Sequence, residues 1–161
     1  MAGDFTVEIF RICAQGTADL IKSTGIAHRG FVVGYDTRHG SEGFARAVAE
    51  VTTGNGIPTL LCDKPAPTPV VSFNIVHRAA GGGAIITASH NPAEWNGFKF
   101  KPDYGGSASP EIVAQLEERS AAVEQLETVN RMELDVAERQ GLLEYLDPEP
   151  DYLAHVATLI D

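Results

Sequence analysis

Apolar residues along the chain recur at two different spacings, one typical of helices and one typical of strands. Helical spacing predicts five helices, at residues 7–24, 42–53, 69–78, 110–126 and 152–160. Short apolar runs between them predict four strands, at residues 31–35, 57–62, 84–87 and 98–101. Thr6 and Ser41 precede two of the helical patterns and are expected to be their N-caps. This alternation of helix and strand is typical of an α/β domain.

The connections between the strands predict their order. Strands one to three are joined by helices, so they are expected to be parallel, with right-handed crossovers. Only about ten residues separate strands three and four, which is too few for a helical crossover, so this pair is expected to be antiparallel. We therefore expect a three-layer α/β/α domain with a mixed four-stranded sheet of order 2-1-3-4, in which strand four is the antiparallel edge. A site is expected at the carboxyl ends of strands one and three.

The last part of the chain is organised differently. Residues 127–146 carry no clear periodic pattern, and Asp-Pro-Glu-Pro at residues 147–150 has the composition of a linker. The helical pattern that follows stops without a C-cap. We predict one domain at residues 1–146, then a linker with the start of a second domain at residues 147–161, as in a piece of a longer protein.

Charge and composition exclude several classes of protein. Twelve Lys and Arg residues against twenty-two Asp and Glu residues give a net charge of −10, which argues against binding to nucleic acid or to an anionic membrane. No apolar run approaches the roughly 20 residues of a membrane span, and no signal segment opens the chain. Cys13 and Cys62 lack the spacing of a metal site or of a disulfide framework. We expect a cytoplasmic protein.

The expected loop after strand three concentrates the candidate chemistry. Residues 87–97 read Thr-Ala-Ser-His-Asn-Pro-Ala-Glu-Trp-Asn-Gly, although turns are rich in such residues in any case. Ser89 and His90 are consecutive, so their side chains are expected to point apart. This disfavours a serine hydrolase, as does the absence of a G-x-S-x-G elbow. Lys99 and Lys101 are expected on one face near the serine, where they suit a phosphate better than an acyl group.

The hexapeptide at residues 87–92, followed by Asn-Gly-Phe-Lys at residues 96–99, resembles the active-site signature of the α-D-phosphohexomutases. This is the family of phosphoglucomutase, phosphomannomutase and phosphoglucosamine mutase. The resemblance covers about residues 3–126 and is closer to the glucose and mannose branch than to the glucosamine branch. It implies an isomerase that interconverts hexose 1-phosphate and hexose 6-phosphate through a phosphoserine and a bisphosphate intermediate.

The same resemblance implies roles for individual residues. Ser89 is similar to the serine that carries the phosphoryl group, and its phosphate would be a ligand of Mg²⁺. His90 and Lys99 are similar to neighbours implicated in proton transfer and charge stabilisation.

Arg38, Asn91 and Lys101 are expected to bind the substrate or its phosphate. For Arg38, which is a looser match, an ion pair with Asp36 on the surface is the alternative.

The chain also departs from the family pattern. The segment that precedes Asp-Phe-Thr (residues 4–6) in the family is absent here, as are the Asp-Gly-Asp metal loop, the sugar-selecting loop and the phosphate-binding loop of the later domains. No Asp-x-Asp cluster completes a magnesium site. The resemblance therefore implies domain I alone, which needs the remaining domains as partners and is expected to be inactive in isolation. The alternative is a non-catalytic module that binds phosphate or a partner chain through the same loop.

Overall fold

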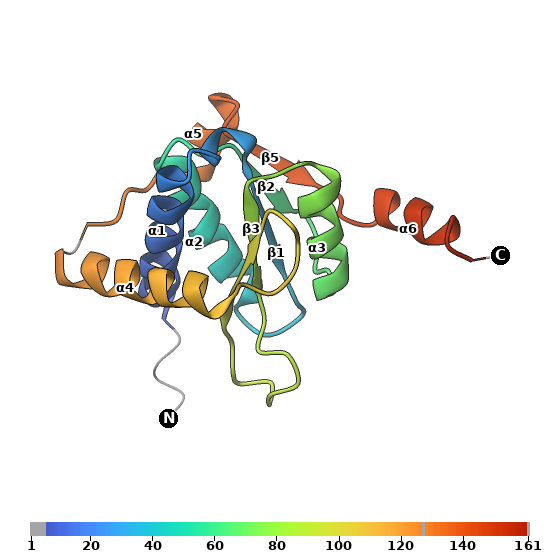
Figure 1. Ribbon diagram of the computed structural model, residues 1–161, viewed down its shortest axis with the longest axis horizontal. Helices are drawn as coiled ribbons and strands as arrows, with labels where there is room; N and C mark the ends of the chain where they lie inside the picture. The colour runs from blue at the N-terminus through green and yellow to red at the C-terminus, as the bar shows by residue number, and fades with distance from the viewer. Residues whose placement is uncertain (1–5, 127, 161) are drawn as a thin grey trace.

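A mixed sheet of five strands forms the centre of the molecule, in the order β4-β3-β1-β2-β5 (Figure 1). Four strands run parallel to one another: β1 (Phe31–Tyr35), β2 (Thr59–Cys62), β3 (Gly82–Ile86) and β5 (Leu143–Leu146). The edge strand β4 (Phe98–Pro102) pairs antiparallel with β3. The predicted order 2-1-3-4 and the antiparallel fourth strand are confirmed, but the sheet has five strands and the expected number of four is wrong.

The fifth strand lies in the segment that had no clear pattern. β5 extends the sheet beyond β2, with Leu143 opposite Thr59 and Leu146 opposite Cys62. Its two leucines are buried, whereas the two residues between them are exposed. Buried and exposed residues do not alternate along these four positions, so the sequence lacks the pattern that identifies a strand. Pairing with β2 is what defines β5 as a strand.

The helices cover both faces of the sheet (Figure 1). Their bounds are α1 (Val7–Ser23), α2 (Ser41–Gly54), α3 (Thr68–His77), α4 (Pro110–Leu126), α5 (Leu134–Arg139) and α6 (Pro150–Ala157). α1, α2 and α4 lie on one side of the sheet, and α3 lies on the other with α6 packed against it. The predicted three-layer α/β/α class is confirmed. This computed structural model describes residues 6–126 and 128–160, so Asp4 and Phe5 of the Asp-Phe-Thr segment lie outside the described residues.

Helices on both faces explain the composition of the central strands. Every residue of β1 and β3 is buried, as expected for parallel strands covered on two sides. The approach of α3 to the sheet is close at Gly83, where an added Cβ would lie 2.6 Å from both the Ile75 Cδ1 atom and the Val32 carbonyl oxygen. Only glycine fits this position without displacing the backbone of β1.

One predicted helix cap is confirmed and one is wrong. The Thr6 hydroxyl accepts a hydrogen bond from the Ile9 N–H at 3.4 Å, as predicted for an N-cap. α2 begins at Ser41 itself, and its N-cap is Gly40 in the left-handed conformation, with φ of 79°. The Ser41 hydroxyl donates to the Asp36 carboxylate at 2.8 Å instead. The residue that the sequence assigned to a helix end therefore belongs to the site described below.

The chain after residue 147 packs on α3 through aromatic rings. The Phe73 ring stacks on His77 of its own helix and on His155 of α6, and it meets Tyr152 edge-on. The domain boundary predicted at residue 146 stays a prediction. None of the helices in the described residues combines the length and apolar character needed to cross a bilayer.

Candidate active site

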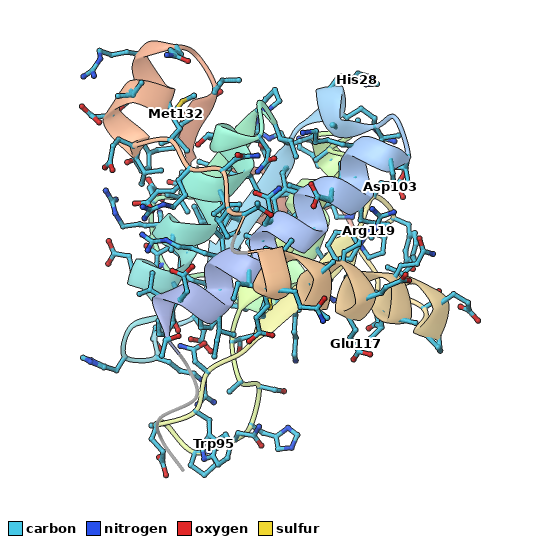
Figure 2. The ribbon with its side chains drawn as sticks, turned by 90° about the vertical axis from the view of Figure 1, so that its left-hand side faces the viewer. His28, Trp95, Asp103, Glu117, Arg119 and Met132 are labelled. Atoms are coloured by element: carbon cyan, nitrogen blue, oxygen red, sulfur yellow. The ribbon has the colours of Figure 1, made fainter. Side chains whose placement is uncertain are left out.

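Two loops meet where β1 and β3 end, as the strand order predicts. The Asp36 N–H donates to the Ile86 carbonyl at 3.1 Å, and the Thr87 N–H donates to the Gly97 carbonyl at 3.0 Å. The second bond closes the base of a loop, residues 87–97, which we call the serine loop. It projects beyond the sheet with Trp95 near its far end (Figure 2). Residues 89–95 are exposed, whereas Thr87, Ala88 and Asn96 at its base are buried.

Ser89 has a left-handed backbone, with φ of 58°. Its N–H donates to the Thr87 hydroxyl oxygen at 3.0 Å, which holds the chain in this conformation. The Ser89 Oγ lies 3.4 Å from Nδ1 of His90. The prediction that these two side chains point apart is therefore wrong, because it assumed extended backbone and the left-handed turn brings them together. Both residues are exposed to solvent.

Arg38, from the loop after β1, lies against the serine loop. Its Nε donates to the Asp36 carboxylate at 3.1 Å, so the ion pair offered as the alternative for Arg38 is present. Its two terminal nitrogens donate to four backbone carbonyls of the serine loop, at distances of 2.6–3.3 Å: Ser89, Asn91, Pro92 and Trp95. Only 13% of the side chain is exposed. Phosphate binding by Arg38 stays a prediction.

Asp36 organises the base of the site. Its carboxylate accepts hydrogen bonds from the Ser41 hydroxyl at 2.8 Å and from the Arg38 backbone N–H at 3.0 Å. Partial burial acts to raise the pKa of Asp36. Hydrogen bonds from Thr87, from the Arg38 backbone and from Ser41, together with the Arg38 charge, outweigh burial and lower that pKa below its usual value. Asp36 is therefore held as a carboxylate that fixes both loops.

Asn96 is a site residue that the sequence offered only as part of a motif. Its side chain is buried, donates to the Ser41 hydroxyl oxygen at 2.9 Å and accepts from the Gly97 N–H at 2.9 Å. Asn91, by contrast, is exposed, and its backbone N–H closes a turn onto the Ala88 carbonyl at 3.1 Å. The Asn-Gly pair is a turn signal in any sequence. Its partner Ser41 is 55 residues away, which no local pattern reveals.

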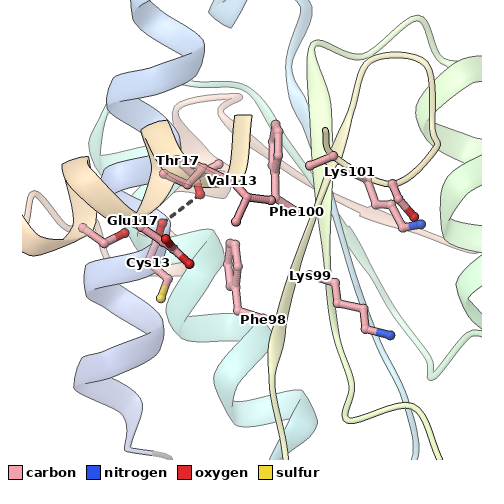
Figure 3. Close-up of a pocket in the computed structure, with 12 residues that line it drawn as sticks. Cys13, Thr17, Phe98, Lys99, Phe100, Lys101, Val113 and Glu117 are labelled. Carbon is pink, nitrogen blue, oxygen red and sulfur yellow. Dashed lines mark hydrogen bonds between the residues drawn. The ribbon is translucent and has the colours of Figure 1, made fainter. Parts of the chain in front are cut away.

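The two lysines of β4 share one face of the strand, as predicted (Figure 3). Lys99 lies opposite Ile85 and is exposed, whereas Lys101 lies opposite Gly83, two positions farther from the serine loop. Burial, and then the neighbouring charge of Lys99, lower the pKa of Lys101. Phe98 and Phe100 project from the other face into a cavity of about 430 Å³ between α1 and α4. Lys99 is therefore the nearer of the two lysines to the serine loop along the strand.

The side chains around Ser89 do not make a complete magnesium site. Within residues 6–126 and 128–160, no group of three or more His, Cys, Asp or Glu side chains could hold a metal ion. The carboxylate of Asp36 is already engaged by Arg38, Ser41 and Thr87. The cysteines contribute nothing here: Cys13 and Cys62 are free thiols, and burial raises the pKa of Cys62 to about 12.

The chain is similar to known proteins in both sequence and fold. Residues 1–127 match the family described as phosphoglucomutase/phosphomannomutase, alpha/beta/alpha domain I. A phosphoglucomutase of Staphylococcus saprophyticus is 32% identical over 131 residues, which is 80% of this chain and 24% of that protein. A Haemophilus influenzae protein assigned as a probable phosphomannomutase is 36% identical over 115 residues, which is 68% of this chain and 24% of its own length.

The fold is also similar to that of solved structures. A crystal structure of a Thermus thermophilus protein assigned as a phosphomannomutase superposes with a TM-score of 0.81 and 30% identity. The match covers 99% of this chain and 33% of that one. The chain thus spans about a quarter of the length of these curated relatives and a third of the length of this solved one.

Proposed function

The chain belongs to the phosphoglucomutase/phosphomannomutase family, as its α/β/α domain I, and we propose that it supplies the phosphoryl-carrying serine of a phosphohexomutase. The enzyme would interconvert hexose 1-phosphate and hexose 6-phosphate, with glucose or mannose as the sugar. The observation that carries this proposal is Ser89. Its hydroxyl is exposed on a loop at the carboxyl end of β3, and a left-handed backbone held by two neighbouring groups fixes its direction.

In the proposed reaction the phosphoryl group moves from Ser89 to the sugar and back. The P–O bond to the Ser89 Oγ breaks while a new P–O bond forms to the free sugar hydroxyl, which gives a bisphosphate and a neutral serine hydroxyl. The second phosphoryl group of the bisphosphate then returns to Ser89. In the first transfer the sugar hydroxyl loses its proton and the departing Ser89 Oγ gains one. In the second transfer the Ser89 hydroxyl loses its proton and the released sugar oxygen gains one, so each transfer requires a group beside Ser89 that can accept and donate a proton.

His90 and Lys99 are the groups proposed for these proton and charge roles. The His90 Nδ1 atom is 3.4 Å from the Ser89 Oγ, close enough to exchange a proton after a small rotation. Lys99 offers an exposed cation on the adjacent strand, and phosphoryl transfer depends on cations that neutralise the phosphate oxygens. Magnesium would add to that neutralisation when bound. Since the described residues do not form its site, the remaining ligands would come from other parts of the enzyme.

Turnover of the full-length gene product tests the proposal. The enzyme is expected to convert glucose 1-phosphate or mannose 1-phosphate to the 6-phosphate in a coupled assay. Ser89→Ala is expected to lower turnover by about 10³-fold or more, as when a covalent nucleophile is lost. Ser107→Ala is the matched control, because Ser107 is a serine of another loop outside the site, and it should leave turnover unchanged.

Two outcomes would contradict the proposal. Equal turnover of Ser89→Ala and wild type, with matched melting temperatures, would remove the carrier role from Ser89. Tight binding of sugar phosphate by a gene product that never turns it over would favour the alternative, a non-catalytic module that binds phosphate through the serine loop.

A further inference from the structure

We propose that Arg38 is a positioning residue, which holds the serine loop in its reactive shape by binding the backbone carbonyls of that loop. The importance of this positioning role for catalysis rests on the proposed function, because Ser89 lies in the serine loop. The proposal gives Arg38 a different task from the phosphate binding that the sequence suggested.

The guanidinium group of Arg38 has no N–H left for a phosphate. Arginine carries five N–H donors, one on Nε and two on each terminal nitrogen. Nε donates to Asp36 at 3.1 Å, and Nη1 donates to the carbonyls of Pro92 and Trp95 at 2.6 and 3.3 Å. Nη2 donates to the carbonyls of Ser89 and Asn91 at 2.8 and 2.7 Å. An incoming phosphate would have to displace one of these bonds.

The serine loop needs such a group at its centre. Two turns, closed by the Asn91 N–H on Ala88 and by the Trp95 N–H on Pro92, curl the chain so that several carbonyls converge on one point. Converging carbonyl oxygens repel one another, and a cation placed among them offsets that repulsion. A planar cation with its donors in a rigid fork satisfies four of them at once, which a lysine cannot do.

The contact reaches the reactive residue directly. The Ser89 peptide groups are held on both sides, with the N–H on the Thr87 hydroxyl and the carbonyl on Arg38. Asp36 accepts hydrogen bonds from the Arg38 N–H and guanidinium, and Thr87 helps to lower the pKa of the same carboxylate, so both anchors of Ser89 interact with Asp36. Removing the guanidinium therefore frees the backbone that sets the direction of the Ser89 Oγ.

Trp95 gives a direct readout of the loop. It is the only tryptophan in the chain, it lies in the serine loop, and its carbonyl is one of the four that Arg38 binds. Arg38→Met and Arg38→Lys are compared with wild type by hydrogen exchange of residues 88–97 and by acrylamide quenching of Trp95. Arg46→Met is the matched control, because Arg46 is an exposed arginine on the neighbouring helix α2. Circular dichroism and the melting temperature check that each variant is folded.

Both Arg38 variants are expected to raise exchange in the loop by about tenfold or more, since bonds to a charged group are lost. Quenching of Trp95 should rise with it, and Arg46→Met should match wild type. Lysine at position 38 retains the positive charge but is not expected to return exchange in the serine loop to the wild-type rate. If Arg38→Lys exchanges like wild type, or if Arg38→Met leaves exchange within about twofold, the positioning role is wrong. If Arg38→Met does not fold, Arg38→Lys alone decides.

Kinetics of the full-length gene product separate positioning from phosphate binding. Positioning predicts that Arg38→Lys lowers kcat by about tenfold or more while KM for the sugar phosphate stays within about twofold of wild type. A rise in KM at unchanged kcat would instead assign Arg38 to the phosphate and overturn the proposal. The hydrogen-exchange measurement does not depend on turnover. If Ser89 carries no phosphoryl group, the proposed function is wrong, but the effect of Arg38 on exchange in the serine loop can still be measured.

Discussion

Ser89 combines an exposed side chain with a backbone conformation that serine rarely adopts. Within the described residues only Ala79 and Ser89 are non-glycine residues with positive φ. The left-handed region costs a residue with a Cβ atom about 1–2 kcal/mol. The hydrogen bond from the Ser89 N–H to the Thr87 hydroxyl oxygen and the bond from Arg38 to the Ser89 carbonyl offset that cost. The surrounding loop, and not the preference of serine, therefore sets the direction of the hydroxyl.

Replacing Ser89 by glycine or by alanine tests this backbone strain. Both substitutions remove the hydroxyl, but only glycine relieves the left-handed conformation. We expect Ser89→Gly to be at least as stable as Ser89→Ala, and up to about 1 kcal/mol more stable, in urea unfolding at neutral pH. A clearly more stable alanine variant would show that Ser89 is not held in the left-handed region.

Asp36 makes the site sensitive to acid. Its pKa is lowered in the folded state, so the stability that it contributes is fully present above the ordinary aspartate pKa of about 3.9 and is lost as pH falls through the lower folded value. The melting temperature of wild type should therefore fall more steeply below about pH 4 than that of Asp36→Asn. Glu111 and Asp147 also have lowered pKa values, but wild type and Asp36→Asn both contain them. The difference between the two proteins in the slope of melting temperature against pH therefore reports on Asp36. Parallel slopes would contradict this role.

Strand β4 carries aromatic side chains on one face and basic side chains on the other. Phe98 and Phe100 turn toward α1 and α4, whereas Lys99 turns away from them and is exposed (Figure 3). Side chains that alternate along a strand allow one face to be altered while the other is kept. Substitutions on β4 can therefore test the two faces separately.

Lys99→Ala is expected to lower turnover of the full-length gene product by about 10²-fold at unchanged stability, because one cation is lost while the carrier remains. Phe98→Ala is expected to do the reverse, with a loss of about 2 kcal/mol of stability because the ring is partly buried. A coupled assay and thermal unfolding of both variants make the comparison. A Lys99→Ala enzyme that is fully active would remove Lys99 from the site.

The segment that leads to β5 crosses α2 at one glycine. An added Cβ at Gly54 would lie 2.6 Å from the Cα of Arg131, and the Met132 N–H donates to the Glu50 carbonyl nearby. Gly54→Ala should lower stability by about 1–3 kcal/mol because backbone must move. Gly43→Ala in the same helix meets no atom within 4 Å and should raise stability by about 0.5–1 kcal/mol. Urea unfolding of Gly54→Ala and Gly43→Ala compares the two positions. Equal changes in stability would contradict the close contact between Gly54 and the segment at Arg131.

The order of the first four strands could be predicted because each was flanked by its own signals, such as the turn residues before α2 and the alternation of Phe98 and Lys99. β5 could not, because its pairing with β2 is the only thing that makes those four residues a strand. The serine loop was found from its residue types, but the bonds that shape it were not. Arg38 binds carbonyls more than 50 residues away, and backbone atoms carry no sequence signal.

At the scale of the molecule, this chain spans about a quarter of the length of the curated relatives it matches. It contains the serine loop and the two lysines of β4, whereas its described residues hold no metal-binding cluster. The net charge of −10 gives no general attraction for phosphorylated ligands, so the proposed binding of a sugar phosphate would depend on local cations near Ser89.

The 161-residue chain by itself is expected to show only background activity in the coupled assay of glucose 1-phosphate. Phosphoryl transfer needs the carrier, a complete set of cations and a clamp for the second phosphate of the substrate, which act together. Turnover that survives purification of this chain to homogeneity, and that Ser89→Ala removes, would show that the chain is sufficient.

Mass mapping of the peptide that contains Ser89 asks directly whether this side chain accepts a phosphoryl group. The full-length gene product is incubated with glucose 1,6-bisphosphate carrying isotopically labelled phosphoryl groups, digested and mapped, with Ser89→Ala as the control. One labelled phosphoryl group is expected on Ser89, and this label should disappear when excess glucose 1-phosphate is added. Label on a different residue, or no label on Ser89 in an enzyme that interconverts the hexose phosphates, would contradict the proposed carrier role of Ser89.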